Sequence, residues 1–274
     1  MTETVLSVDD LHVRDPRSGT ELVCGVSFDL PAGGALGIVG ESGSGKTLTC
    51  RTALGILPAP LGVTAGRVTL LGRDTAVLTE REWRELRGRG IGAVFQDPGA
   101  FLNPSLRIGS QVAEVLRVGK RLGRRAARAE AVALLDAVHL RDPERVYRQY
   151  PHELSGGMLQ RVVIAAAIAL DPQILIADEA TTALDVTVQA EILDLLADLR
   201  ERIGLALVVV SHDLAVVAQL CEEVVVLRDG EVVERGATAA VLHEPRHPYT
   251  RLLVDEHNRY GLDRYLAPEL EHAG

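Results

Sequence analysis

A glycine-rich segment has residue types and spacing suited to holding phosphate groups: Gly40, Glu41, Ser42, Gly43, Ser44, Gly45, Lys46 and Thr47. It fits the pattern G-x-x-x-x-G-K-[ST], in which glycines let several backbone N–H groups point toward one anion. Lys46 is one of only two lysines beside 27 arginines, and a compact ammonium suits the β- and γ-phosphates of a nucleotide better than a planar guanidinium. The pattern also predicts that the Thr47 hydroxyl binds Mg²⁺. The alternative, a purely structural turn, is disfavoured because the loop follows an apolar strand.

Two adjacent carboxylates, Asp178 and Glu179, end a second apolar run at 174–177. Side chains alternate along a strand, so neighbouring acids at its end point differently and can take different roles. We expect Asp178 to hold Mg²⁺, directly or through water, and Glu179 to polarise the water that attacks the γ-phosphate. Taken alone, the pair could also be an exposed loop feature.

Polar residues follow two further apolar runs. His212 comes after 205–210, and Gln96 ends the run 91–95. Ligands of parallel α/β sheets lie at the carboxyl ends of the strands. His212 is therefore a candidate γ-phosphate contact, and Gln96 a candidate contact of Mg²⁺ or the attacking water. Without the phosphate loop, His212 would read as a hydrogen-bonded structural histidine.

Ser155, Gly156 and Gly157 precede an apolar stretch at 162–170. Ser155 is a suitable N-cap, and the two glycines allow close approach of another backbone. Local pattern leaves two interpretations open: an ordinary helix start, or a contact surface for a ligand.

The elements that must position these residues alternate between strands and helices. Apolar and alternating runs predict strands at 5–13, 22–30, 35–39, 67–71, 91–95, 174–177, 205–210, 224–227 and 231–233. Helical patterns are expected at 46–57, 80–87, 162–170, 188–202 and 213–218, and throughout 106–150, where no strand pattern occurs. A β-α-β alternation interrupted by an all-helical region predicts an α/β fold with a doubly wound core and a helical subdomain.

Composition excludes several classes of protein. The net charge of −9 argues against binding of nucleic acid through phosphate contacts, and we read the basic residues between 120 and 128 as the solvated face of a helix. No apolar run approaches the roughly 18 residues that would span a bilayer, and we expect no signal peptide after Met1. The separated cysteines Cys24, Cys50 and Cys221 indicate reduced thiols.

In their order along the chain, the phosphate loop, Gln96, the segment Leu154–Met158, the acidic pair, Ala183-Leu184-Asp185 and His212 resemble the motifs of ATP-binding cassette (ABC) ATPases. The resemblance covers about residues 3–245. It implies a RecA-like P-loop NTPase core with an antiparallel β subdomain and a helical insertion at about 97–158. It also implies ATP and Mg²⁺ as cofactors and a head-to-tail dimer, in which Ser155, Gly156, Gly157 and Asp185 contribute to nucleotide binding.

A narrower resemblance is to the ATPases of dipeptide, oligopeptide and nickel importers. It rests on 40–46, 95–104, 156–161, 181–187 and the motif His247-Pro248-Tyr249-Thr250. It implies hydrolysis coupled to uptake, at the cytoplasmic face of the plasma membrane. The implied partners are two transmembrane permease subunits, a second ATPase subunit or second copy, and, indirectly, an extracytoplasmic substrate-binding protein. The alternative is a soluble, non-transport ABC ATPase.

Three features depart from the family pattern. Ala180 stands where the family usually has proline, and no aromatic residue lies near 13–15 to stack on adenine, which leaves Arg14, His12 or a partner for that role. The cassette is expected to span 1–245, so 246–274 would form only a short extension without a cysteine-bearing tail.

Overall fold

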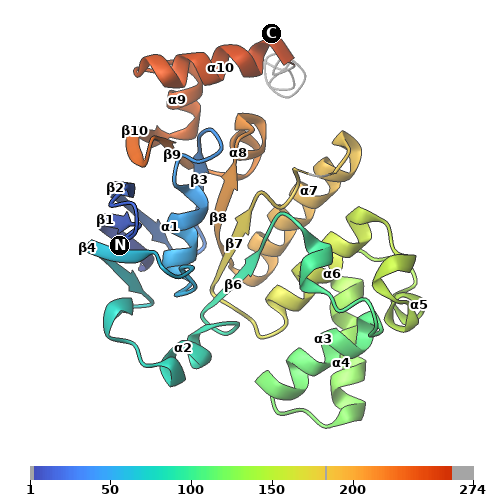
Figure 1. The fold of residues 1–274 in the computed structure, drawn as a ribbon. Coiled ribbons are helices and arrows are strands. Elements are labelled where there is room, and N and C mark those ends of the chain that lie inside the picture. The colour runs from blue at the N-terminus through green and yellow to red at the C-terminus, as the bar shows by residue number, and fades with distance from the viewer. Residues whose placement is uncertain (1–2, 183, 261–274) are drawn as a thin grey trace.

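The computed structural model describes residues 3–182 and 184–260, which form two sheets and surrounding helices (Figure 1). Antiparallel strands form one sheet in the order β2-β1-β4-β5: β1 (Thr4–Arg14), β2 (Glu21–Pro31), β4 (Gly62–Leu70) and β5 (Arg73–Asp74). The second sheet has the order β10-β9-β3-β8-β7-β6. Its members are β3 (Ala35–Val39), β6 (Ile91–Val94), β7 (Ile174–Asp178), β8 (Ala206–Ser211), β9 (Glu223–Arg228) and β10 (Glu231–Ala237).

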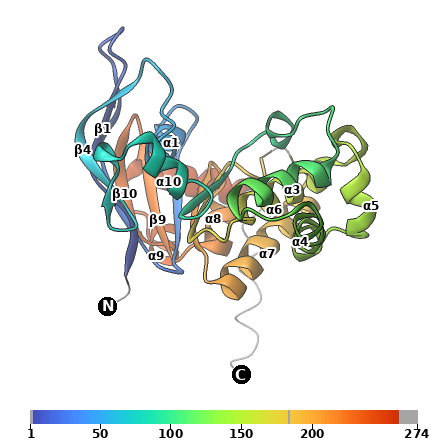
Figure 2. The same ribbon diagram turned by 90° about the horizontal axis from the view of Figure 1, so that it is seen from below.

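Ten α-helices lie within the described residues. They are α1 (Lys46–Ala53), α2 (Glu80–Leu86), α3 (Ile108–Gly119), α4 (Arg124–Ala137), α5 (Pro143–Arg148), α6 (Gly156–Ile168), α7 (Val186–Ile203), α8 (Leu214–Leu220), α9 (Thr238–His243) and α10 (Pro248–Tyr260). Helices α3 to α6 gather at the end of the molecule away from β1 and β4 (Figure 2). The α/β class and the antiparallel sheet agree with the fold predicted from the sequence.

The central strand β3 is buried on both faces. Leu36 and Ile38 pack with β1, β2 and α1, whereas Ala35 and Val39 belong to the core on the opposite face. Close packing also explains why residue 37 is glycine, because a Cβ there would lie 2.2 Å from Cγ1 of Val217 on α8. Parallel strands need such double coverage, which explains their continuous apolar sequences.

Several element boundaries differ from the predicted ones for local reasons. The helix after the phosphate loop ends at Ala53 rather than near 57, because Gly55 adopts a φ of +64°. A Cβ on Gly55 would also lie 2.5 Å from the Trp83 ring, so α2 packs directly against this turn. Helix α6 begins at Gly156, ahead of the predicted 162, because Ser155 caps it. Strand β4 begins at Gly62, ahead of the predicted 67.

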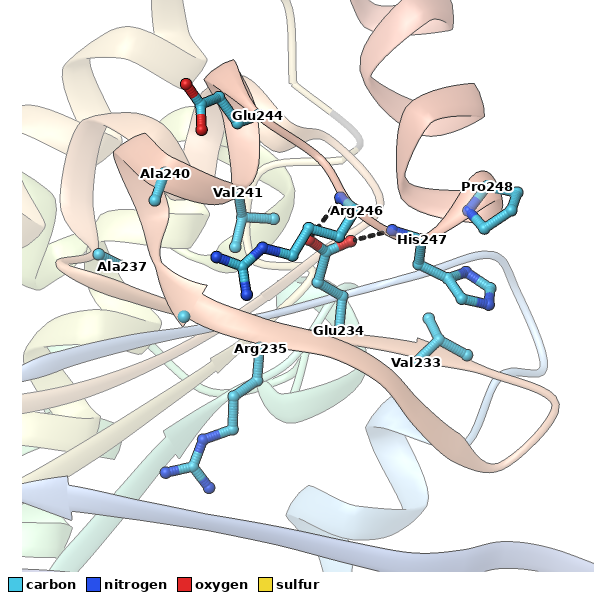
Figure 3. Close-up of a pocket in the computed structure, with 11 residues that line it drawn as sticks. Val233, Glu234, Arg235, Ala237, Ala240, Val241, Glu244, Arg246, His247 and Pro248 are labelled. Carbon is cyan, nitrogen blue, oxygen red and sulfur yellow. Dashed lines mark hydrogen bonds between the residues drawn. The ribbon is translucent and has the colours of Figure 1, made fainter.

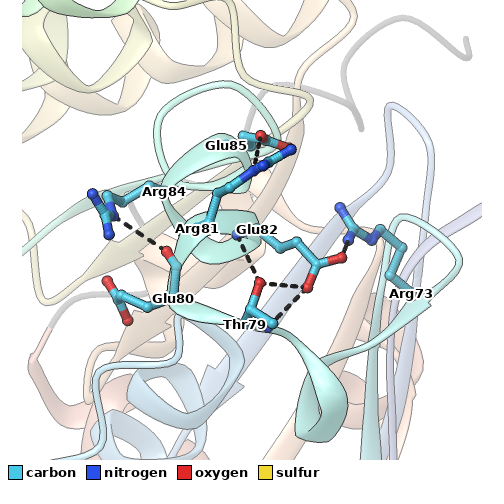
Figure 4. Close-up of polar contacts among 7 residues, drawn as sticks. All are labelled: Arg73, Thr79, Glu80, Arg81, Glu82, Arg84 and Glu85. Atoms are coloured by element: carbon cyan, nitrogen blue, oxygen red, sulfur yellow. Dashed lines mark hydrogen bonds and ion pairs between the residues drawn. The ribbon is translucent and has the colours of Figure 1, made fainter.

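A capping box fixes the start of α2. The Thr79 hydroxyl accepts a hydrogen bond from the Glu82 N–H at 3.4 Å, and the Glu82 carboxylate accepts one from the Thr79 N–H at 2.8 Å (Figure 4). The Thr79 hydroxyl also donates to the Glu82 carboxylate at 2.7 Å. The bonds from the Thr79 N–H and hydroxyl lower the pKa of Glu82, and Arg73 pairs with the same carboxylate. The reciprocal bonds satisfy two N–H groups that a helix start otherwise leaves free. Helix α2 lies in the segment that connects the antiparallel sheet to β6, and the chain continues from β6 to Gln96.

Candidate nucleotide-binding site

The register of the parallel strands brings the residues predicted to bind nucleotide and act in hydrolysis to one edge of the second sheet. Val39 of β3 lies opposite Ser211 of β8, and Val210 of β8 lies opposite Asp178 of β7. Strand β6 pairs with β7 in the same direction. The residues that follow these strands therefore leave the sheet side by side, at its carboxyl edge.

A cavity of about 650 Å³ lies at this edge. Eight of the site residues predicted from the sequence line it: Gly40, Glu41, Ser42, Thr47, Gln96, Asp178, Glu179 and His212. Four further lining residues were missed by the sequence analysis: Arg51, Phe95, Leu253 and Glu256. Leu253 and Glu256 of α10 are three positions apart and therefore lie on one face of the helix. This spacing is the sequence signal that could have paired them.

The backbone of the phosphate loop requires glycine at three positions. Gly40, Gly43 and Gly45 have φ values of +152°, +85° and +97°. A Cβ on Gly40 would lie 2.1 Å from the carbonyl oxygen of Leu227, and no side chain fits there. Around Gly43, by contrast, nothing lies within 4 Å of the position a Cβ would take. The loop is thus packed where it leaves β3 and open where an anion would approach.

Lys46 is buried, with 4% of its surface exposed. Its ammonium donates to the carbonyl oxygens of Gly40 and Glu41, each at 2.7 Å. Burial lowers its pKa, and the nearby carboxylates of Glu179 and Asp178 oppose that shift. The Ser44 hydroxyl in the same loop is buried and has no hydrogen-bond partner among residues 3–182 and 184–260. A buried cation that donates to neutral carbonyl oxygens, in the same loop as this buried hydroxyl, fits a site that receives an anion.

The two residues predicted to bind Mg²⁺ are in contact. The Thr47 hydroxyl donates to Oδ1 of Asp178 at 3.2 Å, although the residues are 131 positions apart. Burial raises the pKa of Asp178, and the bond from Thr47 partly offsets it. A hydroxyl and a carboxylate beside a phosphate loop are the hard oxygen donors that Mg²⁺ uses together with phosphate oxygens. The residues present fit the ion.

Glu179 occupies a constrained position directly after β7. Its φ is +50°, in the left-handed region, and its N–H donates to the Val210 carbonyl oxygen at 2.9 Å. The His212 Nδ1 lies 4.0 Å from its carboxylate, which also accepts from the Thr182 hydroxyl at 3.4 Å. Glu179 is 20% exposed and His212 54% exposed, so both side chains remain accessible from the cavity. Backbone strain of this kind persists where the surrounding structure enforces it, often at functional sites.

A second group of predicted residues lies elsewhere and does not line the cavity. The Ser155 hydroxyl caps α6 by accepting from the Met158 N–H at 3.4 Å. Asp185 caps α7 in the same way. The two helix starts pack together, because a Cβ on Gly157 would lie 2.4 Å from Cγ1 of Val188. Within the predicted motif 183–185, Ala183 lies outside the described residues.

The side chains considered for adenine stacking are engaged with acidic neighbours. His12 Nδ1 lies 2.6 Å from the Glu21 carboxylate, and Nε2 lies 3.3 Å from Asp10. The hydrogen bond with Glu21 raises the pKa of His12. Arg14 lies 3.7 Å from the same Glu21. The stacking partner of adenine therefore stays a prediction with its alternatives open.

A phosphate loop, an acidic pair and a histidine at the carboxyl edge of such a sheet define a P-loop ATPase, and the chain belongs to the ABC transporter family, whose model matches residues 23–182. The oligopeptide transport ATP-binding protein OppD of Bacillus subtilis is 45% identical over 90% of this chain and 70% of its own length. The metal-staphylopine import system ATP-binding protein CntD of Staphylococcus aureus is 38% identical over 92% of both chains. These similarities confirm the predicted family and its narrower resemblance.

A solved structure supports the fold independently. The dimeric cassette MJ0796, bound to ADP and Pi in a post-hydrolysis state, superimposes with a TM-score of 0.73. It is 31% identical to this chain and covers 85% of it, with 98% of its own length matched. The protein is thus an ABC-type ATP hydrolase, as the sequence predicted.

Lys46→Arg should lower ATP binding or hydrolysis at least tenfold, on the order of 1.4 kcal/mol, although it keeps the charge. Two carbonyl oxygens at 2.7 Å hold the Lys46 ammonium as a compact point charge, a role that the larger, planar guanidinium of arginine fills poorly. Mg-ATP titration and a phosphate-release assay measure the effect. Arg51→Lys, which makes the reverse exchange at a residue that lines the cavity, serves as the control. Near-normal turnover of Lys46→Arg would contradict this account of the loop.

Proposed function

We propose that this chain is the ATP-hydrolysing subunit of an ABC importer for peptides or for a nickel- or metallophore-type substrate. The observation that carries the proposal is its 45% identity over 90% of the chain to an oligopeptide transport ATP-binding protein. The match to a metal-staphylopine import protein keeps the metallophore alternative open. No residue of this chain has to contact the cargo, since substrate selection would belong to the permease and the binding protein.

In this proposal the site residues predicted from the sequence have distinct roles. The loop from Gly40 to Thr47 binds the β- and γ-phosphates through backbone N–H groups, and Lys46 adds a positive charge. Thr47 and Asp178 would hold Mg²⁺, with Gln96 beside them, and the ion would neutralise charge that develops on the phosphates. Glu179 orients and polarises the attacking water.

His212 completes the arrangement at the γ-phosphate. Its position 4.0 Å from the Glu179 carboxylate lets it contact a γ-phosphate oxygen while the carboxylate faces the water. Interactions that strengthen as charge moves during phosphoryl transfer accelerate hydrolysis more than binding. His212 and Glu179 would therefore act together on the same phosphate.

The residues outside the cavity would serve the nucleotide of a second cassette. Ser155 caps α6, and Gly156 and Gly157 lie in its first turn, where backbone N–H groups have no partner within the helix. Asp185 opens α7 next to them. In a head-to-tail pair, of two copies or of this chain with a second ATPase, these helix starts would cover the γ-phosphate bound on the partner.

Permease subunits would dock near the start of the helical region, at 96–104. The Phe101 ring is 56% exposed and stacks on Phe95 at 5.3 Å, and Leu106 is 49% exposed. Exposed apolar groups at one place favour a protein contact. Within the described residues no helix is long and apolar enough to cross a membrane. From the proposed permease contact we infer peripheral attachment at the cytoplasmic face. We also propose that 97–158 is the helical insertion of a cassette spanning 1–245.

Phe101→Arg should reduce recovery of permease subunits about tenfold, because a charge replaces the apolar contact. The tagged chain is purified from detergent-extracted membranes of its host, and retained integral membrane proteins are quantified by mass spectrometry. Val77→Arg, a similar change at a position that is 76% exposed and lies outside 97–158, is the matched control. Retention of soluble ribosomal or repair proteins in place of permeases would favour the non-transport alternative.

A further inference from the structure

The chain after β10 is held in a fixed direction by three hydrogen bonds. The Glu234 carboxylate accepts from the backbone N–H of Arg246 at 2.8 Å and from that of His247 at 2.9 Å (Figure 3). Nδ1 of His247 then accepts from the N–H of Tyr249 at 3.2 Å. These bonds connect the last strand to the first turn of α10 and determine where that helix runs.

Tyr249 extends from this turn to the phosphate loop. Its hydroxyl oxygen accepts a hydrogen bond from the backbone N–H of Glu41 at 2.9 Å. The side chain is only 3% exposed, and the Arg228 guanidinium lies 4.9 Å from the ring centroid. Burial raises the pKa of the Tyr249 hydroxyl, which therefore stays neutral. The contact joins residues 208 positions apart.

Tyr249 and Lys46 bind the same peptide group, the one between Gly40 and Glu41. Carbonyl oxygens of Gly40 and Glu41 accept from the Lys46 ammonium, and the N–H of Glu41 donates to Tyr249. Because a peptide unit is rigid, fixing its N–H also fixes the neighbouring carbonyl of Gly40. Tyr249 thus contributes to the orientation of the Gly40–Glu41 peptide in the loop.

The same helix reaches the cavity. Leu253 and Glu256 follow Tyr249 by four and seven positions, on one face of α10, and both line the cavity. In Figure 1, α10 lies across the end of the sheet from which the phosphate loop leaves. The Tyr249 contact therefore sets the distance between α10 and the loop.

We propose that Tyr249 is a positioning residue of the nucleotide site, which acts by holding the Glu41 peptide so that the phosphate loop is ordered before the nucleotide binds. The inference rests on the proposed assignment of the loop as the ATP site. It gives the segment 246–256 a role in nucleotide affinity that does not depend on transport. Tyr249 itself is not among the residues that line the cavity.

Tyr249→Phe removes one hydroxyl and keeps the buried ring. It should weaken Mg-ADP and Mg-AMP-PNP binding about fivefold in calorimetry on the full chain, the effect of one net hydrogen bond, with kcat changed less than twofold. Amide hydrogen exchange in the peptide covering 36–46 should become faster. Tyr147→Phe is the matched control, since the Tyr147 ring also lies beneath an arginine, Arg128 at 5.2 Å, but belongs to α5.

Unchanged affinity in Tyr249→Phe, or weaker binding without faster exchange in 36–46, would overturn the proposal. Equal weakening in Tyr147→Phe would overturn it as well, because loss of either hydroxyl would then act through general stability. Lys46→Ala, measured in the same assay, separates this inference from the assignment on which it rests. If Lys46→Ala binds nucleotide as tightly as wild type, the assignment of the site is wrong. If Lys46→Ala loses nucleotide binding, the assignment stands, and the Tyr249→Phe results then test the role of Tyr249 alone.

Discussion

The Glu179→Gln protein is expected to bind Mg-ATP with normal affinity and to hydrolyse it at least ~100-fold more slowly. Glutamine keeps the size of the side chain and an acceptor for the Thr182 hydroxyl, but it removes the charge that polarises water. A group needed only in the transition state lowers turnover without weakening binding. The ATP-loaded, closed dimer should therefore accumulate, and size-exclusion chromatography would detect it.

Asp178→Asn is the matched comparison for this prediction. Asp178 contacts the Thr47 hydroxyl and would hold the metal, so its loss should weaken Mg²⁺-dependent ATP binding itself. One Mg-ATP titration and one turnover assay per variant, with any partner ATPase and permease present, separate the two roles. Substantial turnover by Glu179→Gln would mean that Glu179 is not the base or that a partner supplies the active site. Testing each site of the dimer separately distinguishes these outcomes.

Ser155→Arg should leave ATP affinity of the isolated chain near that of wild type and lower hydrolysis at least about 100-fold, the loss seen when a transition-state hydrogen-bond donor is removed. Ser155 does not line the cavity of its own chain. In the proposed dimer the bulky arginine would occupy the space of the partner's γ-phosphate. Equilibrium binding on the monomer and phosphate release at dimer-forming concentrations provide the two measurements.

Loss of the helix cap must be separated from this effect. Ser155 caps α6 through the Met158 N–H, and removing such a cap costs about 1 kcal/mol of stability. Thr79→Ala removes the cap of α2 and serves as the control for stability alone. Much weaker ATP binding by the Ser155→Arg monomer would place Ser155 in its own nucleotide site and contradict the head-to-tail dimer.

The sequence predicted the parts of the site whose geometry is local. The phosphate loop follows from its glycines, since φ values such as +97° at Gly45 are unfavourable for other residues. Apolar runs located the strands, and parallel strands necessarily end at the same edge. That is why Gln96, Glu179 and His212, chosen one by one at strand ends, line one cavity.

Contacts between distant segments could not be predicted in this way. Tyr249 was recognised only as part of a family motif, and neither its contact with Glu41 nor the approach of α10 to the cavity follows from local periodicity. The position of Lys46 on two backbone carbonyl oxygens was likewise not expected, because its motif indicates only its role with phosphate. Tertiary packing determines the two contacts of α10, whereas the Lys46 bonds form within its own loop and depend on the detailed loop conformation.

The central claim is that the loop 40–47 and the acidic pair form the ATP site. The most direct test is an experimental structure of the Glu179→Gln protein with Mg-ATP. The account predicts the β- and γ-phosphates within the loop, and Mg²⁺ beside Thr47 and Asp178. A second cavity, of about 660 Å³ between β10, α9 and the start of α10, offers a clear alternative location. Nucleotide bound there, or phosphates outside the loop, would contradict the account.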